Sequence, residues 1–308
     1  MLAVFLQTLP FFGIIALGYG SGRTGFFSPE ATAFLTRFVF YFALSAMVFR
    51  FAANLSLAEV LDWQLVTAYL CATAAAYLIV TVVALLRRVS VAEAAVEAQC
   101  GVVGNVGFLG IPMFIVLMGE AAIGPVMLVL AVDLVVFGSL IVILITGSRE
   151  GKLSYGIIQS VGLGLLKNPM IVSISLGLIW SSLALPIPGP MNAFLEILGA
   201  AATPGALFAI GASLATKSAE RIEVAGWLSF AKLVLHPVAV GLAVYILLPV
   251  EDKFAAGIAV ASAALPTAGN VYILAQHYGV APARASATIF ISTAFSILTV
   301  PAVIAWLG

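Results

Sequence analysis

Long apolar segments follow one another along the whole chain, separated by short breaks rich in Gly, Pro and charged residues. A helix needs about 20 residues to cross a hydrocarbon core of about 30 Å, and each segment is close to that length or longer. The pattern predicts ten membrane-spanning helices, at residues 2–20, 32–53, 60–86, 94–119, 121–146, 169–185, 194–215, 224–248, 254–278 and 283–306. We therefore expect an all-α membrane protein.

The ten predicted spans form two groups of five on either side of a more polar stretch. Residues 1–146 are assigned to a first five-helix repeat, 147–167 to a cytoplasmic linker, and 168–308 to a second repeat within the same membrane domain. Because five is an odd number, two related halves would enter the membrane in opposite directions. This inverted-repeat arrangement is typical of many secondary transporters.

Composition excludes a soluble protein and gives no sign of nucleic-acid binding. The chain has 308 residues, of which 63% are hydrophobic and 8% charged, and its mean hydropathy is +1.20. Thirteen Lys and Arg balance thirteen Asp and Glu. Cys71 and Cys100 lie inside predicted helices without metal-like spacing, so neither a disulfide nor a metal site is expected.

The positions of the cations predict the orientation in the membrane, because Lys and Arg concentrate in cytoplasmic loops. Only Arg50 and Lys253 fall at the opposite set of loops, and Lys232 lies inside a span. The ten on one side are Arg23, Arg37, Arg87, Arg88, Arg149, Lys152, Lys167, Lys217, Arg221 and Arg284. This split predicts that both termini are periplasmic or extracellular. The first span has no Lys or Arg before it and no cleavage signature after it, so we interpret it as a permanent span.

Two predicted spans, the fourth and the ninth, are interrupted about halfway along. The interrupting residues are Gly104, Asn105, Gly107, Gly110 and Pro112 in one and Pro266, Thr267, Gly269 and Asn270 in the other. Pro removes a backbone donor and Gly permits non-helical dihedrals, so both spans should unwind locally. Unwound backbone cannot face lipid, since its amides and carbonyls would lack partners there. The two breaks are therefore expected to meet near the middle of the membrane.

Such a crossing suits an anion, because half-helix N-termini carry partial positive charge. Pro112 would lie in the first turn of one restarting half-helix, and Asn270 could cap the other. The alternative is that Gly and Pro only bend the two helices for packing. Because the breaks occur in corresponding spans of the two halves, we favour a binding site.

Motifs along nearly the whole chain resemble the auxin efflux carrier family, and most closely its bacterial, malonate-carrier-like members. They are Leu17-Gly18-Tyr19, Gly104-Asn105, Gly110-Ile111-Pro112, Asn168-Pro169, LFAIGASL at 207–214, His236-Pro237, and Leu265-Pro266-Thr267 with Asn270. The resemblance implies two inverted five-helix repeats with crossing broken helices 4 and 9. It also implies a mobile transport domain, a scaffold domain that often forms a homodimer, and a place in the bacterial inner (plasma) membrane.

The resemblance also implies a substrate class and contact residues. Family members move small carboxylates, with an elevator-like motion, and Asn105 matches an asparagine that contacts substrate in plant members. Gly104 and Ser45 stand where proline is usual, so the second span could be straighter, or Ser45 could offer its hydroxyl to the cavity. The expected substrate-binding residues are Gly104, Asn105, Pro112, Pro266, Thr267, Asn270 and Ser45.

Ionisable residues inside a membrane span are costly and indicate function. Asp133, Lys232 and His236 fall inside predicted spans and are candidates for coupling to H⁺ or Na⁺. Their alternative roles are structural: Lys232 could pair with Asp133, and His236 could be a buried neutral ring bonded to a carbonyl.

The sequence favours a secondary active transporter of small organic anions, such as auxin-like compounds or dicarboxylates, that works by alternating access. The alternative is a sodium-coupled symporter of the bile-acid carrier type. An enzyme is disfavoured because the chain has no His-Glu-x-x-His, paired aspartates or Gly-x-Ser-x-Gly. A channel would need a carbonyl filter or a ring-forming charged span, and neither is present in the sequence. No cofactor is expected apart from a coupling ion, and the expected partners are a small anion and the lipid bilayer.

Overall fold

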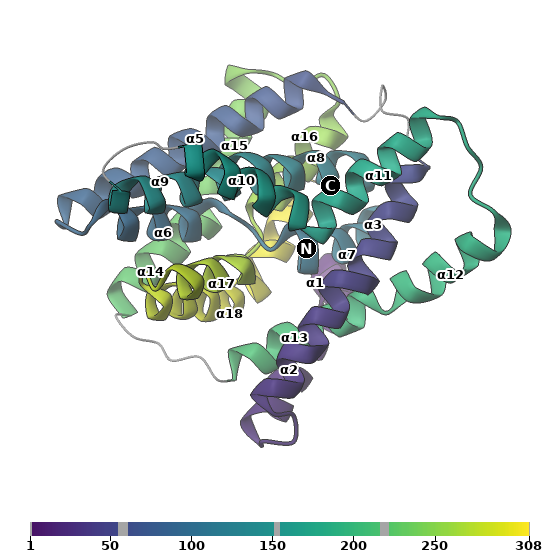
Figure 1. Cartoon of the computed structure of the whole chain (residues 1–308), viewed down its shortest axis with the longest axis horizontal. Coiled ribbons are helices and arrows are strands. Elements are labelled where there is room, and N and C mark those ends of the chain that lie inside the picture. Colours follow the sequence, from purple (N-terminus) through teal and green to yellow (C-terminus); the bar gives the residue numbers. More distant parts are fainter. Residues whose placement is uncertain (1, 55–60, 151–154, 216–221, 308) are drawn as a thin grey trace.

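The computed structural model describes residues 2–54, 61–150, 155–215 and 222–307, and within these ranges every regular element is helical. The first half contains α1 (Leu2–Arg23), α2 (Pro29–Phe38), η1 (Val39–Ala43), α3 (Leu44–Ala53), α5 (Trp63–Leu86), α6 (Val91–Val102), η2 (Val106–Gly110), α7 (Ile111–Met118), η3 (Glu120–Ala122), α8 (Ile123–Val132), η4 (Asp133–Phe137) and α9 (Gly138–Glu150). The predicted all-α class is confirmed (Figure 1).

The second half repeats the use of short helices joined end to end. It contains α10 (Tyr155–Lys167), α11 (Pro169–Ser182), α12 (Gly189–Ala200), α13 (Ala202–Leu214), α14 (Ile222–Phe230), η5 (Ala231–Leu235), α15 (His236–Leu242), η6 (Ala243–Leu247), α16 (Lys253–Ala263), α17 (Gly269–Tyr278) and α18 (Pro282–Leu307). The elements η1, η4 and η5 are single π-helical turns inside longer helices, whereas η2 begins a helix and η6 ends one.

Helix starts follow local capping chemistry. The Ser90 hydroxyl accepts from the Glu93 amide while the Glu93 carboxylate accepts from the Ser90 amide, a reciprocal pair that begins α6. Asn168 caps α11, whose first residue is Pro169. The Asp252 carboxylate caps α16 in the same way. These polar residues fix where each apolar segment becomes helical.

Six helices of the described residues are long and apolar enough to cross a membrane. They are Pro29–Ala53, Trp63–Leu86, Glu120–Ser148, Gly189–Leu214, Ile222–Leu247 and Pro282–Leu307. A seventh would be formed by 161–167 together with Pro169–Ser182, which meet at an angle of 71°. The broken segments Val106–Met118 and Lys253–Ala263 are apolar but individually too short. Multiple membrane spans are thereby confirmed, whereas the number ten and the inversion stay predictions.

The helices pack as two bundles that adjoin each other. In Figure 1, α6, α9 and α14 of one bundle lie on the left, and α3, α11 and α12 of the other lie on the right. The glycine-packed bundle consists of α1, α2, α3, α11, α12 and α13, with α1 packed along α13 and α3 along α11. A Cβ atom at Gly211 would collide with the Ile15 carbonyl, and one at Gly18 with the Phe208 carbonyl. Small residues let these backbones approach, as is common between membrane helices.

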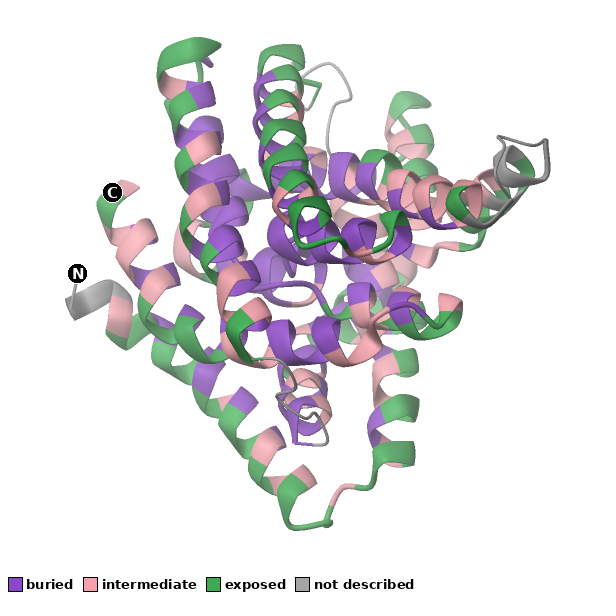
Figure 2. Ribbon diagram, turned by 90° about the vertical axis from the view of Figure 1, so that its left-hand side faces the viewer, coloured by how far each residue is buried: buried purple, intermediate pink, exposed green. Residues whose placement is uncertain are grey.

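The second group, which we call the crossing bundle, contains α5 to α9 and α14 to α18. Its central helices are α6 and α16: residues 94–102 and 255–263 are all buried. A helix that is apolar and buried all around lies in the interior of a structure. The buried residues of Figure 2 accordingly concentrate in the centre, with exposed residues on the outer helices.

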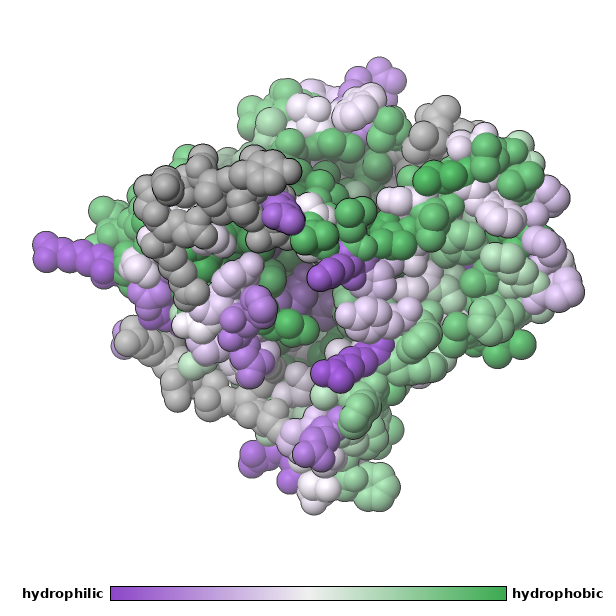
Figure 3. Space-filling model, in the orientation of Figure 1, coloured by the Kyte–Doolittle hydropathy of each residue, from purple (hydrophilic) through white to green (hydrophobic). Residues whose placement is uncertain are grey.

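The outer surface is largely apolar, as expected of a protein embedded in lipid. Leu17, Phe34, Ile197 and Leu247 are all more than 60% exposed. Figure 3 shows apolar side chains over large areas, with fewer polar side chains between them.

The predicted linker 147–167 is largely helical where it is described. Helix α9 continues to Glu150, and α10 occupies Tyr155–Lys167. The segment 157–166 reads IIQSVGLGLL and is mostly apolar, so its two glycines and flanking charges were a poor sign of a loop.

Candidate functional site

Both predicted helix breaks are confirmed. Helix α6 ends at Val102, Val103 is extended (φ −78°, ψ 113°), and helical structure resumes at Val106. Helix α16 ends at Ala263 and α17 begins at Gly269, after an extended Ala268 (φ −70°, ψ 140°). Each interrupted span therefore consists of two half-helices joined by a short extended segment.

The two extended segments lie against each other and form what we call the crossing. An antiparallel bridge joins Gly104 and Thr267. The Asn105 amide donates to the Pro266 carbonyl at 2.8 Å, and the Ala268 amide donates to the Val103 carbonyl at 3.0 Å. Each break thus supplies hydrogen-bond partners that the other needs.

Thr267 helps to hold the crossing together. Its hydroxyl donates to the Cys100 carbonyl at 2.7 Å, and its amide donates to the Ser292 hydroxyl at 3.1 Å. Only 1% of the residue is exposed. The hydroxyl proton is therefore used inside the protein, which makes Thr267 a structural residue of the crossing in this conformation.

Gly104 is required by the close approach of neighbouring atoms. A Cβ atom there would lie 3.0 Å from the Ser262 carbonyl oxygen and 3.4 Å from the Lys232 ammonium nitrogen. A side chain at this position would therefore displace either the backbone of α16 or Lys232.

Asn105 and Asn270 are the predicted ligands whose side chains remain available. Asn105 is 6% exposed, and its side chain has no hydrogen-bond partner in the described part of the chain. The Asn270 Oδ1 atom is buried and equally lacks a partner among the described residues. Because buried polar groups normally have partners, these two amides are open to a ligand.

Two local predictions at the breaks need correction. Ala268, not Asn270, is the N-cap of α17, and no side chain caps this helix, because the bridge to Gly104 fixes the preceding backbone. Pro112 does lie in the first turn of α7, but helical structure already resumes at Val106 through the π-helical turn η2. Pro112 is therefore further from the crossing than predicted.

Both restarting half-helices begin at the crossing. The first hydrogen bonds of one are donated by Leu109 and Gly110 to the Asn105 carbonyl, both at 3.0 Å, so the amides of 106–108 precede them. The other begins at Gly269. Free amides and the helix dipole give each N-terminus partial positive charge.

The hydroxyl of Ser45, another predicted ligand, is bonded within its own span. Its hydroxyl donates at 3.0 Å to the Phe40 carbonyl, five residues earlier, across the π-helical turn η1. Helix α3 packs mainly against α11 and α12. The span is continuous from Pro29 to Ala53, but the π-helical turn interrupts its regular α-helical geometry.

The three predicted ion-coupling residues lie beside the crossing, and two residues that the sequence did not suggest connect them. The Tyr69 hydroxyl donates to Asp133 Oδ1 at 2.9 Å. The Thr73 hydroxyl lies 3.0 Å from His236 Nε2, and His236 Nδ1 lies 3.2 Å from the Lys232 nitrogen. The proposed pairing of Lys232 with Asp133 is not a direct contact, although they are close enough to interact electrostatically.

This polar cluster also touches both broken helices. Lys232 donates to the Ala263 carbonyl at the C-terminal end of α16, where a positive charge is favourable. The Gly104 amide lies near the Asp133 carboxylate, whose Oδ2 atom has no hydrogen-bond partner among the described residues. Among these residues no group of three or more His, Cys, Asp or Glu side chains could hold a metal ion.

A second buried polar group, the ionic cluster, lies at the other end of α6. Glu97 is fully buried and accepts from Arg284 at 2.5 Å and from Arg87. Arg284 also donates to Glu93 at 2.9 Å. The sequence placed Arg284 among the cations of one set of loops and adjoining helix ends; it lies in the first turn of α18, and only 7% of it is exposed.

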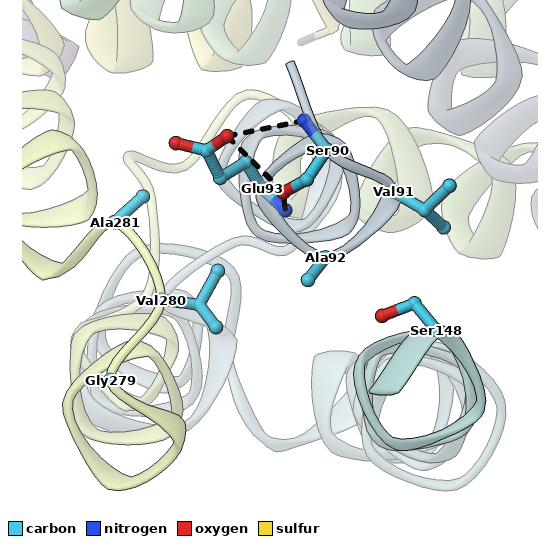
Figure 4. A pocket seen from close by; sticks show the side chains of 8 residues that line it. All are labelled: Ser90, Val91, Ala92, Glu93, Ser148, Gly279, Val280 and Ala281. Carbon is cyan, nitrogen blue, oxygen red and sulfur yellow. Dashed lines mark hydrogen bonds between the residues drawn. The ribbon is translucent and has the colours of Figure 1, made fainter. Parts of the chain in front are cut away.

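A cavity of about 510 Å³ adjoins this ionic cluster (Figure 4). Its walls come from the start of α6, the end of α9 and the turn between α17 and α18. The lining residues are Ser90, Val91, Ala92, Glu93, Ser148, Gly279, Val280 and Ala281. None of the crossing residues lines it.

Comparison with known proteins agrees with these features. The sequence profile of the family described as "Membrane transport protein" matches residues 3–304. A protein of Rhizobium meliloti (strain 1021) named "Putative malonate transporter" is 34% identical over 298 residues, which cover 95% of this chain and 92% of that protein. The chain therefore belongs to the membrane transport protein family, the auxin efflux carrier family that its motifs resemble, and is a transporter and not an enzyme.

Proposed function

We propose that this protein is a secondary active transporter that carries small organic anions past the crossing. The observation that carries the proposal is the meeting of two half-helix N-termini beside Asn105, a buried side-chain amide that makes no hydrogen bond to any described residue. Two positive helix ends favour a carboxylate, and an open amide can donate to it. The Asn270 Nδ2 group on the other half-helix, which makes no hydrogen bond to any described residue, adds a second possible donor.

A small dicarboxylate is the substrate we favour. The two N-termini belong to different half-helices and approach the crossing from different spans, so each can face one carboxylate group. The name of the Rhizobium meliloti relative, a malonate transporter, supports the same class. Malonate is therefore the probe of choice.

Alternating access would come from movement of the crossing bundle against the glycine-packed bundle. The half-helix that begins at Val106 contacts the glycine-packed bundle through side chains: Phe108 stacks on Phe40, in the π-helical turn between α2 and α3, at a centroid distance of 5.9 Å. A Cβ atom at Gly107 would lie 2.9 Å from the end of the flexible Met170 side chain. Side-chain contacts of this kind can be exchanged more readily than the backbone contacts within the glycine-packed bundle.

The ten-span inverted repeat and its orientation belong to this proposal. The antiparallel bridge at the crossing fits two segments that enter from opposite sides. With the cations inside, both termini face the periplasm of a bacterial inner membrane. A C-terminal alkaline phosphatase fusion should then be active and a C-terminal green fluorescent protein fusion dark; the reverse result would contradict the orientation.

The proposed site is tested by truncating its two open amides. Asn105→Ala and Asn270→Ala should each lower the rate of malonate exchange in proteoliposomes by at least about tenfold, the loss expected when a charge-assisted hydrogen bond worth about 1.5–3 kcal/mol is removed. Asn54→Ala is the matched control, because this exposed asparagine donates to the Arg50 carbonyl at the end of α3. Unchanged exchange in both site variants would reject the site.

A further inference from the structure

The buried polar cluster beside the crossing forms a nearly continuous row of proton donors and acceptors. It runs from Asp133 through Tyr69, Thr73 and His236 to Lys232, with three contacts of 2.9, 3.0 and 3.2 Å. The hydroxyls of Tyr69 and Thr73, one turn apart on α5, adjoin each other. All five residues are 0–2% exposed.

The charges at the two ends of this row are separated. Asp133 and Lys232 share no ion pair, although both are buried, and an unpaired charge inside a protein is costly. A proton that moves along the row removes both charges at once. Lys232 gives a proton to His236 Nδ1, and His236 Nε2 gives one to the Thr73 oxygen.

The transfer is completed on α5. The Thr73 hydroxyl proton passes to the Tyr69 oxygen, and the Tyr69 proton passes to Asp133 Oδ1. Each intermediate group gains one proton and loses one. The result is a neutral amine and a neutral carboxylic acid, and the reverse transfer restores the two charges.

Both ends of the row also adjoin the proposed binding site. The Lys232 nitrogen would lie 3.4 Å from a Cβ atom at Gly104, and the Gly104 amide lies near the Asp133 carboxylate. An anion at the crossing therefore stabilises a positive charge on Lys232 through a short, poorly screened interaction.

We propose that this row is a proton-binding site of the carrier, and that it takes up one proton from water when an anion binds at the crossing. Asp133 and Lys232 are then both protonated, so the extra positive charge offsets one negative charge of the substrate. The inference rests on the proposed function and names H⁺ as its coupling ion. Tyr69 and Thr73 are positioning residues, because they act through Asp133 and Lys232 and not on the substrate.

The surroundings of Asp133 favour a proton over Na⁺. A hard cation takes several oxygen ligands, whereas Asp133 faces a hydroxyl donor from α5, a backbone amide from the crossing and the ammonium group of Lys232 from η5. His236, from α15, faces Lys232. These are the titratable and charged groups that surround the row among the described residues, and within that set Asp133 alone supplies an anionic ligand.

Tyr69→Phe and Thr73→Val test the row, because each removes a hydroxyl and keeps the side-chain volume. Tyr77→Phe is the matched control: Tyr77 is buried on the same helix, and its hydroxyl donates to the Ala95 carbonyl outside the row. In proteoliposomes the two row variants should keep malonate exchange. Uptake driven by an alkaline interior should fall by about a hundredfold, the usual contribution of a positioned proton donor. Tyr77→Phe should keep both activities.

Failure of the inference and failure of the proposed function give different results. Absence of malonate exchange by the unaltered protein counts against the proposed function. The proton row is overturned if Tyr69→Phe and Thr73→Val take up malonate under a pH gradient as fast as the unaltered protein does. It is also overturned if a Na⁺ gradient alone drives uptake.

A measurement without a ligand tests the inference even if the protein does not exchange malonate. Infrared difference spectra between acid and alkaline buffer should contain the carbonyl stretch of a protonated carboxyl group. One component of this band should be missing in Asp133→Asn and should shift in Tyr69→Phe, with no change in Tyr77→Phe. A spectrum without the band, or a band unaffected by Tyr69→Phe, overturns the proposal.

Discussion

Both ends of helix α6 bury polar groups, but the two ends differ in whether these groups have hydrogen-bond or ion-pair partners. At its N-terminal end, the carboxylates of Glu93 and Glu97 are paired with Arg284, and Glu97 also with Arg87. At its C-terminal end, by the crossing, polar atoms are left without partners in the described part of the chain. They are Gln99 Oε1, Asp133 Oδ2, Ser262 Oγ and Asn270 Oδ1, together with the side chain of Asn105.

This difference distinguishes a polar cluster that stabilises the fold from one that serves transport. Paired charges fix a geometry, since breaking them leaves an uncompensated charge inside the protein. Unpaired polar groups contribute little to folding and are costly unless a ligand, ion or water completes them. We therefore expect substitutions at the ionic cluster to affect stability, and substitutions at the crossing to affect transport.

The largest effect is expected for Glu97→Gln. This change leaves the buried Arg284 guanidinium without its closest carboxylate, which costs about 3–5 kcal/mol when a buried pair is broken. Thermal unfolding of the detergent-solubilised protein should show a marked loss of stability.

Glu196→Gln provides the comparison for Glu97→Gln. Glu196 pairs with Arg50 at 3.2 Å, but 61% of its side chain is exposed, so its loss should cost at most about 1 kcal/mol. Equal melting temperatures for the two variants would show that the ionic cluster contributes no more than a surface pair.

An intermediate effect is expected for Gly104→Ala. The new Cβ would lie 3.0 Å from the Ser262 carbonyl oxygen, which is tighter than ordinary packing and should cost about 1–3 kcal/mol. Gly269→Ala is the matched control at the same crossing, because no atom lies within 4 Å of its added Cβ. If both variants melt and transport malonate alike, close packing does not explain the glycine at 104.

The positions of the breaks could be predicted because their signals are local. Pro266 and Gly104 disfavour a regular helix regardless of what surrounds them, and the lipid forces unwound segments together. The cap of α17 could not be predicted in the same way. Its N-cap is Ala268, since the preceding backbone is held by the bridge to Gly104 and not by a capping side chain.

The polar partners could not be predicted because they depend on distant contacts. Glu97 and Arg284 are 187 residues apart, and only the folded chain shows that this arginine at a helix end is buried and paired with Glu97. Tyr69 and Thr73 lie in an apolar helix whose sequence contains no break or motif. Asp133 and Lys232 were found because a charge inside a span is conspicuous, whereas the hydroxyls that connect them are not.

The smallest effect on stability is expected for Asn105→Ala, and it is the sharpest test of the comparison. The Asn105 side chain makes no hydrogen bond within the described part of the chain, so its removal breaks none. The free energy of unfolding should therefore fall by no more than about 1 kcal/mol, measured as a small change in melting temperature. Thr267→Val, at the same crossing, should cost about 1–3 kcal/mol because the Cys100 carbonyl loses its hydroxyl donor. Transport should show the reverse order, with Asn105→Ala the more impaired. A strongly destabilised Asn105→Ala would mean that this amide supports the fold, and the crossing would then be as structural as the ionic cluster.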